Sequence, residues 1–113
     1  MALSLAMFAL VGHRLAGGIA YAEDDMTYKI YCSRCHGDEG HGDGPDAATL
    51  TAHPRNFTDC AAMAKIPNDT LFKAIKDGGA AVGISGEMPS WGTGLSDEDI
   101  KGMIKYVRHF CQK

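Results

Sequence analysis

The stretch Cys32-Ser33-Arg34-Cys35-His36 decides how the rest of this 113-residue chain is interpreted. A thioredoxin-like redox pair would need a βαβ setting around the two cysteines, and the flanking sequence does not have one. A zinc site would need a second pair of ligands at a defined spacing, whereas the other cysteines stand singly at 60 and 111. The stretch therefore favours a chemistry that uses both cysteines and the histidine together.

The C-x-x-C-H spacing is typical of covalent haem attachment. The sulfurs of Cys32 and Cys35 can add to the two vinyl groups on one edge of the macrocycle, which forms two thioether bonds. His36 follows directly and can reach the iron from the same side as its proximal ligand. The sequence therefore predicts one haem c, bound covalently through Cys32 and Cys35.

Helical segments are expected on both sides of this stretch. Residues 24–34 are compatible with a helix because Asp24 and Asp25 suit its positive N-terminal end. A short helix is expected from Asn68, a good N-cap residue, to about Asp77, because two glycines follow directly.

The last helix has the clearest pattern. Ser96 can cap it, and the three residues that follow are acidic, as suits a first turn. Segments 37–60 and 79–95 are rich in glycine and are expected to be loops. The fold class is therefore a small all-α domain of three to five helices, with too little helix to fill its own centre. The apolar stripe of the last helix consists of Ile100, Met103, Ile104, Val107 and Cys111.

Residues 1–22 are expected to be a signal peptide. Residues 2–12 form a short apolar run, and Ala20-Tyr21-Ala22 is typical of a cleavage site. A transmembrane helix is disfavoured because no stretch approaches about 18 uninterrupted apolar residues. Cleavage after Ala22 would leave residues 23–113 as one exported, periplasmic domain; a retained N-terminal anchor is the alternative.

The charge balance argues against some classes of partner. Loss of Arg14 with the leader would leave ten basic against fourteen acidic residues. A phosphate backbone is bound by clustered Lys and Arg, so no nucleic-acid partner is expected. Membrane contact is expected only if the N-terminal segment is retained. No hydrolase-type grouping and no phosphate-binding loop stands out, so we expect an electron carrier and not an enzyme.

Three stretches of the chain match a known pattern: Cys32-Ser-Arg-Cys-His-Gly37, Gly42-Asp-Gly-Pro45 and Gly86-Glu-Met-Pro-Ser-Trp-Gly92. Together they resemble the class I monohaem cytochromes c, and the resemblance covers nearly all of residues 24–113. It implies a handful of helices wrapped around the haem, with crossing N-terminal and C-terminal helices. It also implies that His36 is the proximal ligand and that Met88, on a loop, is the distal ligand.

Met88 also suits the role of iron ligand by its own chemistry. A thioether is soft and neutral, so it favours Fe(II) and raises the potential relative to an imidazole. Met88 sits on a glycine-flanked loop stiffened by Pro89, where packing does not obviously require it, although a gap-filling role is the simpler alternative. The other methionines considered are Met103 and Met63, expected in the core, and Met26, a remote candidate.

The resemblance further implies contacts around the haem. The backbone carbonyl of Pro45 would accept a hydrogen bond from the second ring nitrogen of His36 and fix the orientation of the ring. Trp91 and the neighbours Arg55 and Asn56 would donate hydrogen bonds near the haem propionates. Packing or a surface position is the alternative for these three side chains.

Other side chains could in principle replace Met88 at the iron. His41, His53 and His109 are the available histidines, and each is expected at the surface. Cys60 and Cys111 remain once the haem has taken two thiols, and in an exported protein they are expected to form a disulfide. The family does not generally carry these two cysteines. A thiolate ligand or a link to another subunit therefore stays open.

Electron transfer is the expected function, because His36 and Met88 would together leave no open coordination site for a substrate. Iron would cycle between Fe(III) and Fe(II), and the partners would be redox proteins that donate and accept the electron. The chain would act as a monomeric shuttle or as the small haem subunit of a periplasmic oxidoreductase. The alternative is a gas-binding or sensory haem protein, which requires a displaceable or non-methionine distal ligand.

Overall fold

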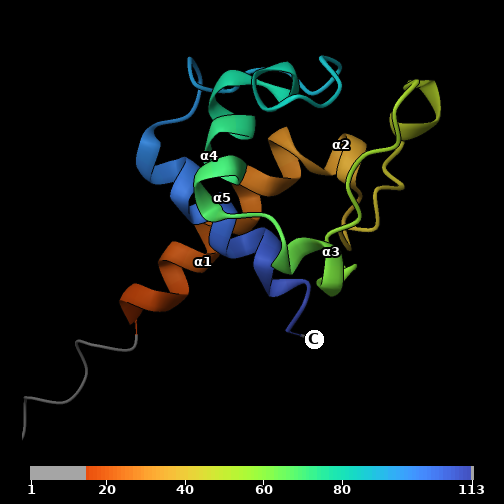
Figure 1. The fold of residues 1–113 in the computed structure, drawn as a ribbon. Coiled ribbons are helices and arrows are strands. Elements are labelled where there is room, and N and C mark those ends of the chain that lie inside the picture. The colour runs from red at the N-terminus through yellow and green to blue at the C-terminus, as the bar shows by residue number, and fades with distance from the viewer. Residues whose placement is uncertain (1–14, 113) are drawn as a thin grey trace, which may run out of the picture.

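The computed structural model describes residues 15–112, and all regular structure within this range is helical (Figure 1). The all-α prediction is thereby confirmed. Among the helices of this range, none has the length and apolar character needed to span a bilayer. The α-helices are α1 (Leu15–Tyr31), α2 (Ser33–His36), α3 (Cys60–Ala64), α4 (Asn68–Asp77) and α5 (Asp97–His109), and the short 3-10 helices are η1 (Ala47–Thr49) and η2 (Gly79–Val82).

The helices α1 and α5 cross near the centre of the molecule, as expected (Figure 1). Tyr28 of α1 is fully buried there, and its ring stacks on that of Tyr106 in α5 with centroids 4.8 Å apart. The close approach needs Gly102, because a Cβ at this position would lie 2.4 Å from Oδ1 of Asp24. The crossing forms one side of the core and fixes where α1 delivers the attachment motif.

The helix α1 starts earlier than residue 24, where the sequence pattern placed its beginning. Its described part begins at Leu15 and runs through the expected cleavage site after Ala22. Residues 1–14 of the expected signal peptide lie outside the described residues. Tyr21, inside the expected leader, packs on Tyr106 with ring centroids 5.8 Å apart. The early turns were missed because the segment Leu15–Ala20 contains two glycines, which disfavour helix.

The helix α4 has the expected bounds but a different N-cap. Pro67 holds the capping position, and Asn68 is the first residue inside the helix. The side-chain oxygen of Asn68 instead accepts a hydrogen bond from Nε of Arg108 in α5, at 2.7 Å. Arg108 also donates to the carbonyl of Ile66 at 2.6 Å, so it ties α5 to the segment before α4.

The helix α5 has the cap and the buried face that its sequence predicts. The Oγ of Ser96 accepts from the N–H of Asp99 at 3.1 Å, and the Asp99 carboxylate accepts from the N–H of Ser96 at 2.9 Å. The helix ends at His109, so Cys111 follows it and is only half-buried. Met103, like Met63 of α3, is buried in the core as expected. The buried residues of α5 are Ile100, Met103, Ile104, Tyr106 and Val107.

The segments expected to be loops contain short helical turns. η1 lies inside segment 37–60 and η2 inside segment 79–95. The five-residue helix α3 starts at Cys60, where the side chain of Asp59 accepts a hydrogen bond from the N–H of Ala62 at 3.1 Å. Helices of three to five residues show no repeated apolar face, so a periodic pattern cannot reveal them.

Candidate haem-attachment site

The C-x-x-C-H motif forms a single helical turn directly after α1. The N–H groups of Cys35 and His36 both donate to the carbonyl of Cys32, at 3.3 and 3.0 Å. Residues three apart on such a turn share one face, so the two cysteine side chains lie on the same side. Both cysteines are free thiols and half-buried. This arrangement fits the formation of two thioether bonds to one edge of a macrocycle.

The two residues between the cysteines are held away from that side. The hydroxyl of Ser33 donates to the carbonyl of Lys29 at 2.8 Å. The guanidinium of Arg34 makes two hydrogen bonds of 2.7 Å to the carboxylate of Asp46. These contacts fix the outer face of the turn.

The chain after the motif folds closely over the same turn. The N–H of Gly42 donates to the carbonyl of His36 at 2.7 Å, and the N–H of Gly44 donates to that of Cys35 at 3.1 Å. A Cβ at Gly44 would lie 2.3 Å from the carbonyl oxygen of Arg34, so only glycine fits there. At Gly37, with φ of +82°, the carbonyl accepts a hydrogen bond of 2.7 Å from the hydroxyl of Tyr28.

The motif cysteines are protonated at neutral pH. Burial raises the pKa of the Cys32 thiol to about 12, and burial also raises the pKa of Cys35. Neutral thiols therefore predominate at neutral pH. In residues 15–112, no three side chains of His, Cys, Asp or Glu are grouped as a metal-ion site.

The His36 ring is oriented by two neighbours. Its Nδ1 lies 3.1 Å from the carbonyl oxygen of Arg55, and its plane stacks on the ring of Phe57 with centroids 4.4 Å apart. Since a carbonyl only accepts, Nδ1 carries the proton and Nε2 keeps the lone pair that an iron ligand needs. Burial lowers the pKa of His36 more than the hydrogen bond to Arg55 raises it, which favours the neutral, ligating form.

The acceptor for the His36 ring in this structure differs from the one that the resemblance implies, and the Pro45 contact stays a prediction. Pro45 was expected to supply the carbonyl, but the structure has the carbonyl of Arg55 in this role. The physical reason lies in the segment that leads to Pro45. Its residues Gly42 and Gly44 donate their N–H groups to the carbonyls of the motif turn, so this segment folds against the turn. Pro45 itself is exposed, and the chain returns to the ring ten residues later.

Met88 lies half-buried on a bend that follows η2. The N–H of Gly79 donates to the carbonyl of Met88 at 3.0 Å, which folds the bend onto the end of α4. Gly78, with φ of +90°, makes room for this approach, since a Cβ there would lie 3.2 Å from the carbonyl oxygen of Met88. The bend is therefore shaped by backbone contacts, and the Met88 side chain is not one of the buried core residues.

Sequence reasoning missed Glu87, the residue before Met88. One carboxylate oxygen of Glu87 accepts from the N–H of Thr51 and the other from the N–H of Ala52, each at 3.0 Å. These two hydrogen bonds lower the pKa of Glu87 to about 2. The only signal in the sequence was an acidic residue beside the expected ligand, which by itself indicates nothing about its partner.

The three side chains expected near the propionates have identifiable neighbours. The Trp91 ring packs edge-on against Tyr31, with centroids 5.3 Å apart. The side-chain oxygen of Asn56 accepts from both the N–H and the hydroxyl of Thr58, at 2.9 and 2.6 Å, and so stabilises a local turn. Arg55 has an exposed side chain and contributes its carbonyl to His36. The propionate contacts therefore stay predictions.

The spare histidines lie at the surface, as expected, and each has a contact of its own. Nδ1 of His41 lies 3.3 Å from the hydroxyl of Thr58, and Nδ1 of His53 lies 2.8 Å from the carbonyl of Pro54. His109 at the end of α5 is also exposed, and its ring centroid is 6.3 Å from that of Tyr21.

The two spare cysteines, distant in sequence, are neighbours in the fold. The Sγ of Cys60 lies 3.8 Å from the carbonyl oxygen of Cys111, and the thiol of Cys111 donates to the carbonyl of Phe57 at 3.1 Å. Both are thiols in the structure, so the disulfide stays a prediction.

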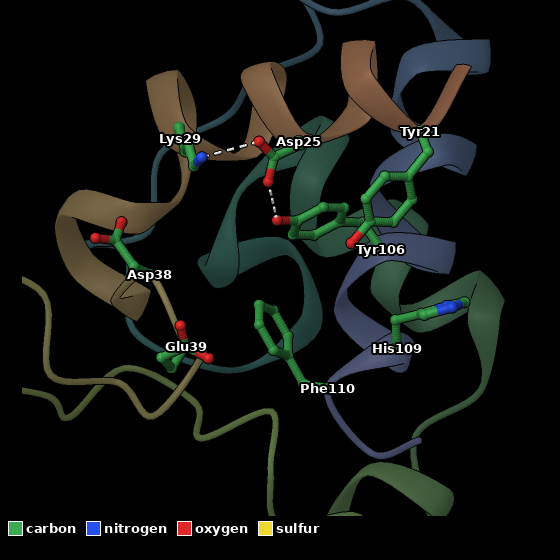
Figure 2. Close-up of a pocket in the computed structure, with 8 residues that line it drawn as sticks. All are labelled: Tyr21, Asp25, Lys29, Asp38, Glu39, Tyr106, His109 and Phe110. Carbon is green, nitrogen blue, oxygen red and sulfur yellow. Dashed lines mark hydrogen bonds and ion pairs between the residues drawn. The ribbon is translucent and has the colours of Figure 1, made fainter. Parts of the chain in front are cut away.

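A cavity of about 330 Å³ between α1 and α5 is separate from the motif (Figure 2). Asp25 of α1 is one of its lining residues; it accepts a hydrogen bond of 2.5 Å from the hydroxyl of Tyr106 and pairs with Lys29 at 2.9 Å. None of the attachment residues lines this cavity, so it is not the haem site. Its lining consists of Tyr21, Asp25, Lys29, Asp38, Glu39, Tyr106, His109 and Phe110.

Comparison with known proteins agrees with the geometry of the motif. A family model described as cytochrome c oxidase, cbb3-type, subunit III matches residues 20–107. Among solved structures, the chain is similar to the KustC0563 c-type cytochrome, with 25% identity and a TM-score of 0.63, over 77% of this chain and 95% of that one. No curated protein matches the chain. The family implies a covalently bound haem c and an electron carrier rather than an enzyme. The chain belongs to the class I cytochrome c family, in the group described by the cbb3-type subunit III model.

Proposed function

We propose that this protein carries single electrons through one haem c that is held by Cys32 and Cys35 and ligated by His36 and Met88. The observation that supports this most directly is the His36 ring, whose Nδ1 proton is held by the Arg55 carbonyl. That contact leaves Nε2 to face a metal. Bound haem would supply one iron that accepts and releases a single electron.

The residues around His36 favour fast exchange because they leave the ring little freedom. Phe57, which stacks on the ring, is buried and belongs to the same cluster as Met63, Tyr106 and Phe110. A ligand fixed between a packed ring and a backbone carbonyl reorients little when the charge on the iron changes. A partner protein would then take or give the electron at an exposed haem edge.

Carbon monoxide separates electron transfer from the gas-binding alternative. We expect that the reduced protein does not bind carbon monoxide at neutral pH, because His36 and Met88 occupy both axial positions. The measurement is the absorption spectrum of the dithionite-reduced protein before and after addition of the gas. Rapid, stoichiometric binding would instead indicate an open or easily displaced position, and the protein would then be a gas-binding haem protein.

Two settings are proposed for the electron carrier. The family description names a subunit of a terminal oxidase, which supports a role as the haem subunit of a redox complex. A diffusing shuttle is the other setting, which the small size of the chain permits. Gel filtration of native extract separates the two, since a shuttle elutes near its own mass of 12.1 kDa or below.

Export to the periplasm, with cleavage after Ala22, is proposed on the sequence of residues 1–22. Such cleavage would remove Tyr21 from its contact with Tyr106. It would also leave Glu23 and Asp24 in the first turn of the shortened α1, where negative charge stabilises a helix. A retained anchor is the alternative, and the intact mass of the exported protein distinguishes the two.

A disulfide between Cys60 and Cys111 is expected in the exported protein, because the two residues are neighbours in the fold. Alkylation without reductant should leave both residues unmodified, and alkylation after reduction should modify both, as read from the intact mass. In the chain-entropy account, a disulfide that closes the loop between residues 60 and 111 stabilises the fold by about 3–4 kcal/mol. Cys60→Ser should leave one reactive thiol and lower the melting temperature. Two reactive thiols in the unreduced protein would contradict the disulfide.

A further inference from the structure

The bend that carries Met88 is fixed at its base by α4. The N–H of Gly79, just after α4, donates to the carbonyl of Met88 at 3.0 Å. Further along, the N–H of Trp91 donates to the carbonyl of Ile75 at 2.9 Å, and the hydroxyl of Ser90 donates to that of Lys76 at 2.5 Å. These contacts hold Met88 and the residues that follow it against the end of α4 and against Gly79, just after it.

The outer part of the bend is held by a different element. Each oxygen of the Glu87 carboxylate accepts one backbone N–H, from Thr51 and from Ala52, which are 36 and 35 positions away in the sequence. The hydroxyl of Ser85 donates to one of these oxygens at 3.2 Å and also accepts from the N–H of Glu87 at 3.1 Å. The carboxylate is thus held by the backbone of Thr51 and Ala52 and by the hydroxyl of Ser85.

The segment that Glu87 holds is the one that orients His36. Thr51 and Ala52 lead directly to Arg55, whose carbonyl lies 3.1 Å from Nδ1 of His36. Glu87 therefore connects the bend that carries the expected distal ligand to the segment that fixes the proximal one. This connection is made by protein atoms alone, without the haem.

We propose that Glu87 is a positioning residue: its carboxylate clips the Met88 bend to the backbone of Thr51 and Ala52 and so keeps the Met88 thioether at the iron. The inference rests on the proposed His36 and Met88 ligation and adds to it the group that keeps the distal side closed. An external ligand can bind only after the neutral thioether of Met88 has left. Any loosening of the bend therefore makes ligand exchange easier.

Imidazole added to the oxidised holoprotein is the probe. In Glu87→Ala the hydrogen bonds from Thr51, Ala52 and Ser85 to the carboxylate are lost. We therefore expect imidazole to bind about tenfold faster than to wild type, given the usual strength of hydrogen bonds to charged groups at an exposed site. Glu87→Gln keeps one acceptor oxygen, so its rate of imidazole binding should lie between those of wild type and Glu87→Ala. The far-red band of methionine on ferric haem should weaken in the same order. Amide exchange at Thr51 and Ala52 should accelerate in parallel.

Glu98→Gln is the matched control. Glu98 is an exposed glutamate in the first turn of α5 that pairs with Lys101 at 3.1 Å, so its replacement removes the same charge at a contact that lies within α5. This variant should bind imidazole at the wild-type rate. The melting temperature of all variants should be compared, because a local loss of positioning predicts a change in ligand exchange that exceeds any change in global stability.

The outcomes separate this inference from the proposed function. The proposed role of Glu87 is supported if imidazole binds slowest to wild type, faster to Glu87→Gln and fastest to Glu87→Ala, while the control binds it at the wild-type rate. If wild type shows the methionine band and the Glu87 variants bind imidazole at its rate, the ligation stands and the clip is wrong. If wild type lacks the band, the proposed ligation fails and the clip fails with it.

Discussion

The double substitution Cys32→Ala with Cys35→Ala is expected to abolish covalent haem attachment. Both thiols lie on one side of the turn Ser33–His36, and addition of each thiol to a vinyl group is the only chemistry that fixes the cofactor to the chain. Without it, haem is retained by axial ligands at most, and unfolding releases it. The measurement is the intact mass of the denatured protein, which should lack the mass of one haem.

The single substitutions and a matched pair sharpen this test. Cys32→Ala and Cys35→Ala alone each leave one thiol, so each should keep a covalent haem at lower yield. The control is Cys60→Ala with Cys111→Ala, which removes two cysteines outside the motif and should keep the full haem mass. Covalent haem in the motif double variant would refute the assignment, as would its loss in the control.

The parts of the fold that the sequence predicts are those with local signals. The helix α5 has a capping box at Ser96 and a buried face that repeats with the helical period, both of which act within a few residues. The end of α4 at Asp77 is marked by the two glycines that follow it. The attachment turn is equally local, since its chemistry is contained in five consecutive residues.

The parts that the sequence does not predict depend on contacts between distant segments. Nothing near Arg55 indicates that its carbonyl, rather than that of Pro45, meets His36, because this depends on how the loop returns to the motif. The contact between Glu87 and Thr51 joins residues 36 positions apart and uses backbone N–H groups, which every residue except proline has. Side-chain patterns identify such partners poorly.

Neighbouring cysteines illustrate the same distinction. The presence of two spare thiols is a matter of counting, but their proximity depends on α3, whose first residue, Cys60, lies beside Cys111 in the segment after α5. The sequence therefore predicts the chemistry available to Cys60 and Cys111, and the fold decides whether they can meet. It brings them together beside Phe57, whose carbonyl accepts a hydrogen bond from the Cys111 thiol.

Replacement of Met88 by alanine is expected to change the ligation and the midpoint potential of the iron more than any other single substitution outside the motif. Removal of the thioether opens the distal position, because the methyl group of alanine has no atom that can ligate the iron. Met88 is half-buried in the wild type. The far-red band of the oxidised protein should disappear, and the reduced protein should bind carbon monoxide stoichiometrically. The midpoint potential should fall by roughly 0.1–0.2 V, a fraction of the roughly 0.8 V range over which axial ligands set haem potentials.

Met26→Ala is the control for this substitution. Met26 lies on α1 with 63% of its surface exposed, so it can be truncated with little effect on packing. The control should keep the far-red band and the midpoint potential, and its reduced form should not bind carbon monoxide. If instead the band survives in Met88→Ala, another methionine must ligate the iron. Met63 and Met103 are buried in the core, so the exposed Met26 would then be combined with Met88→Ala first.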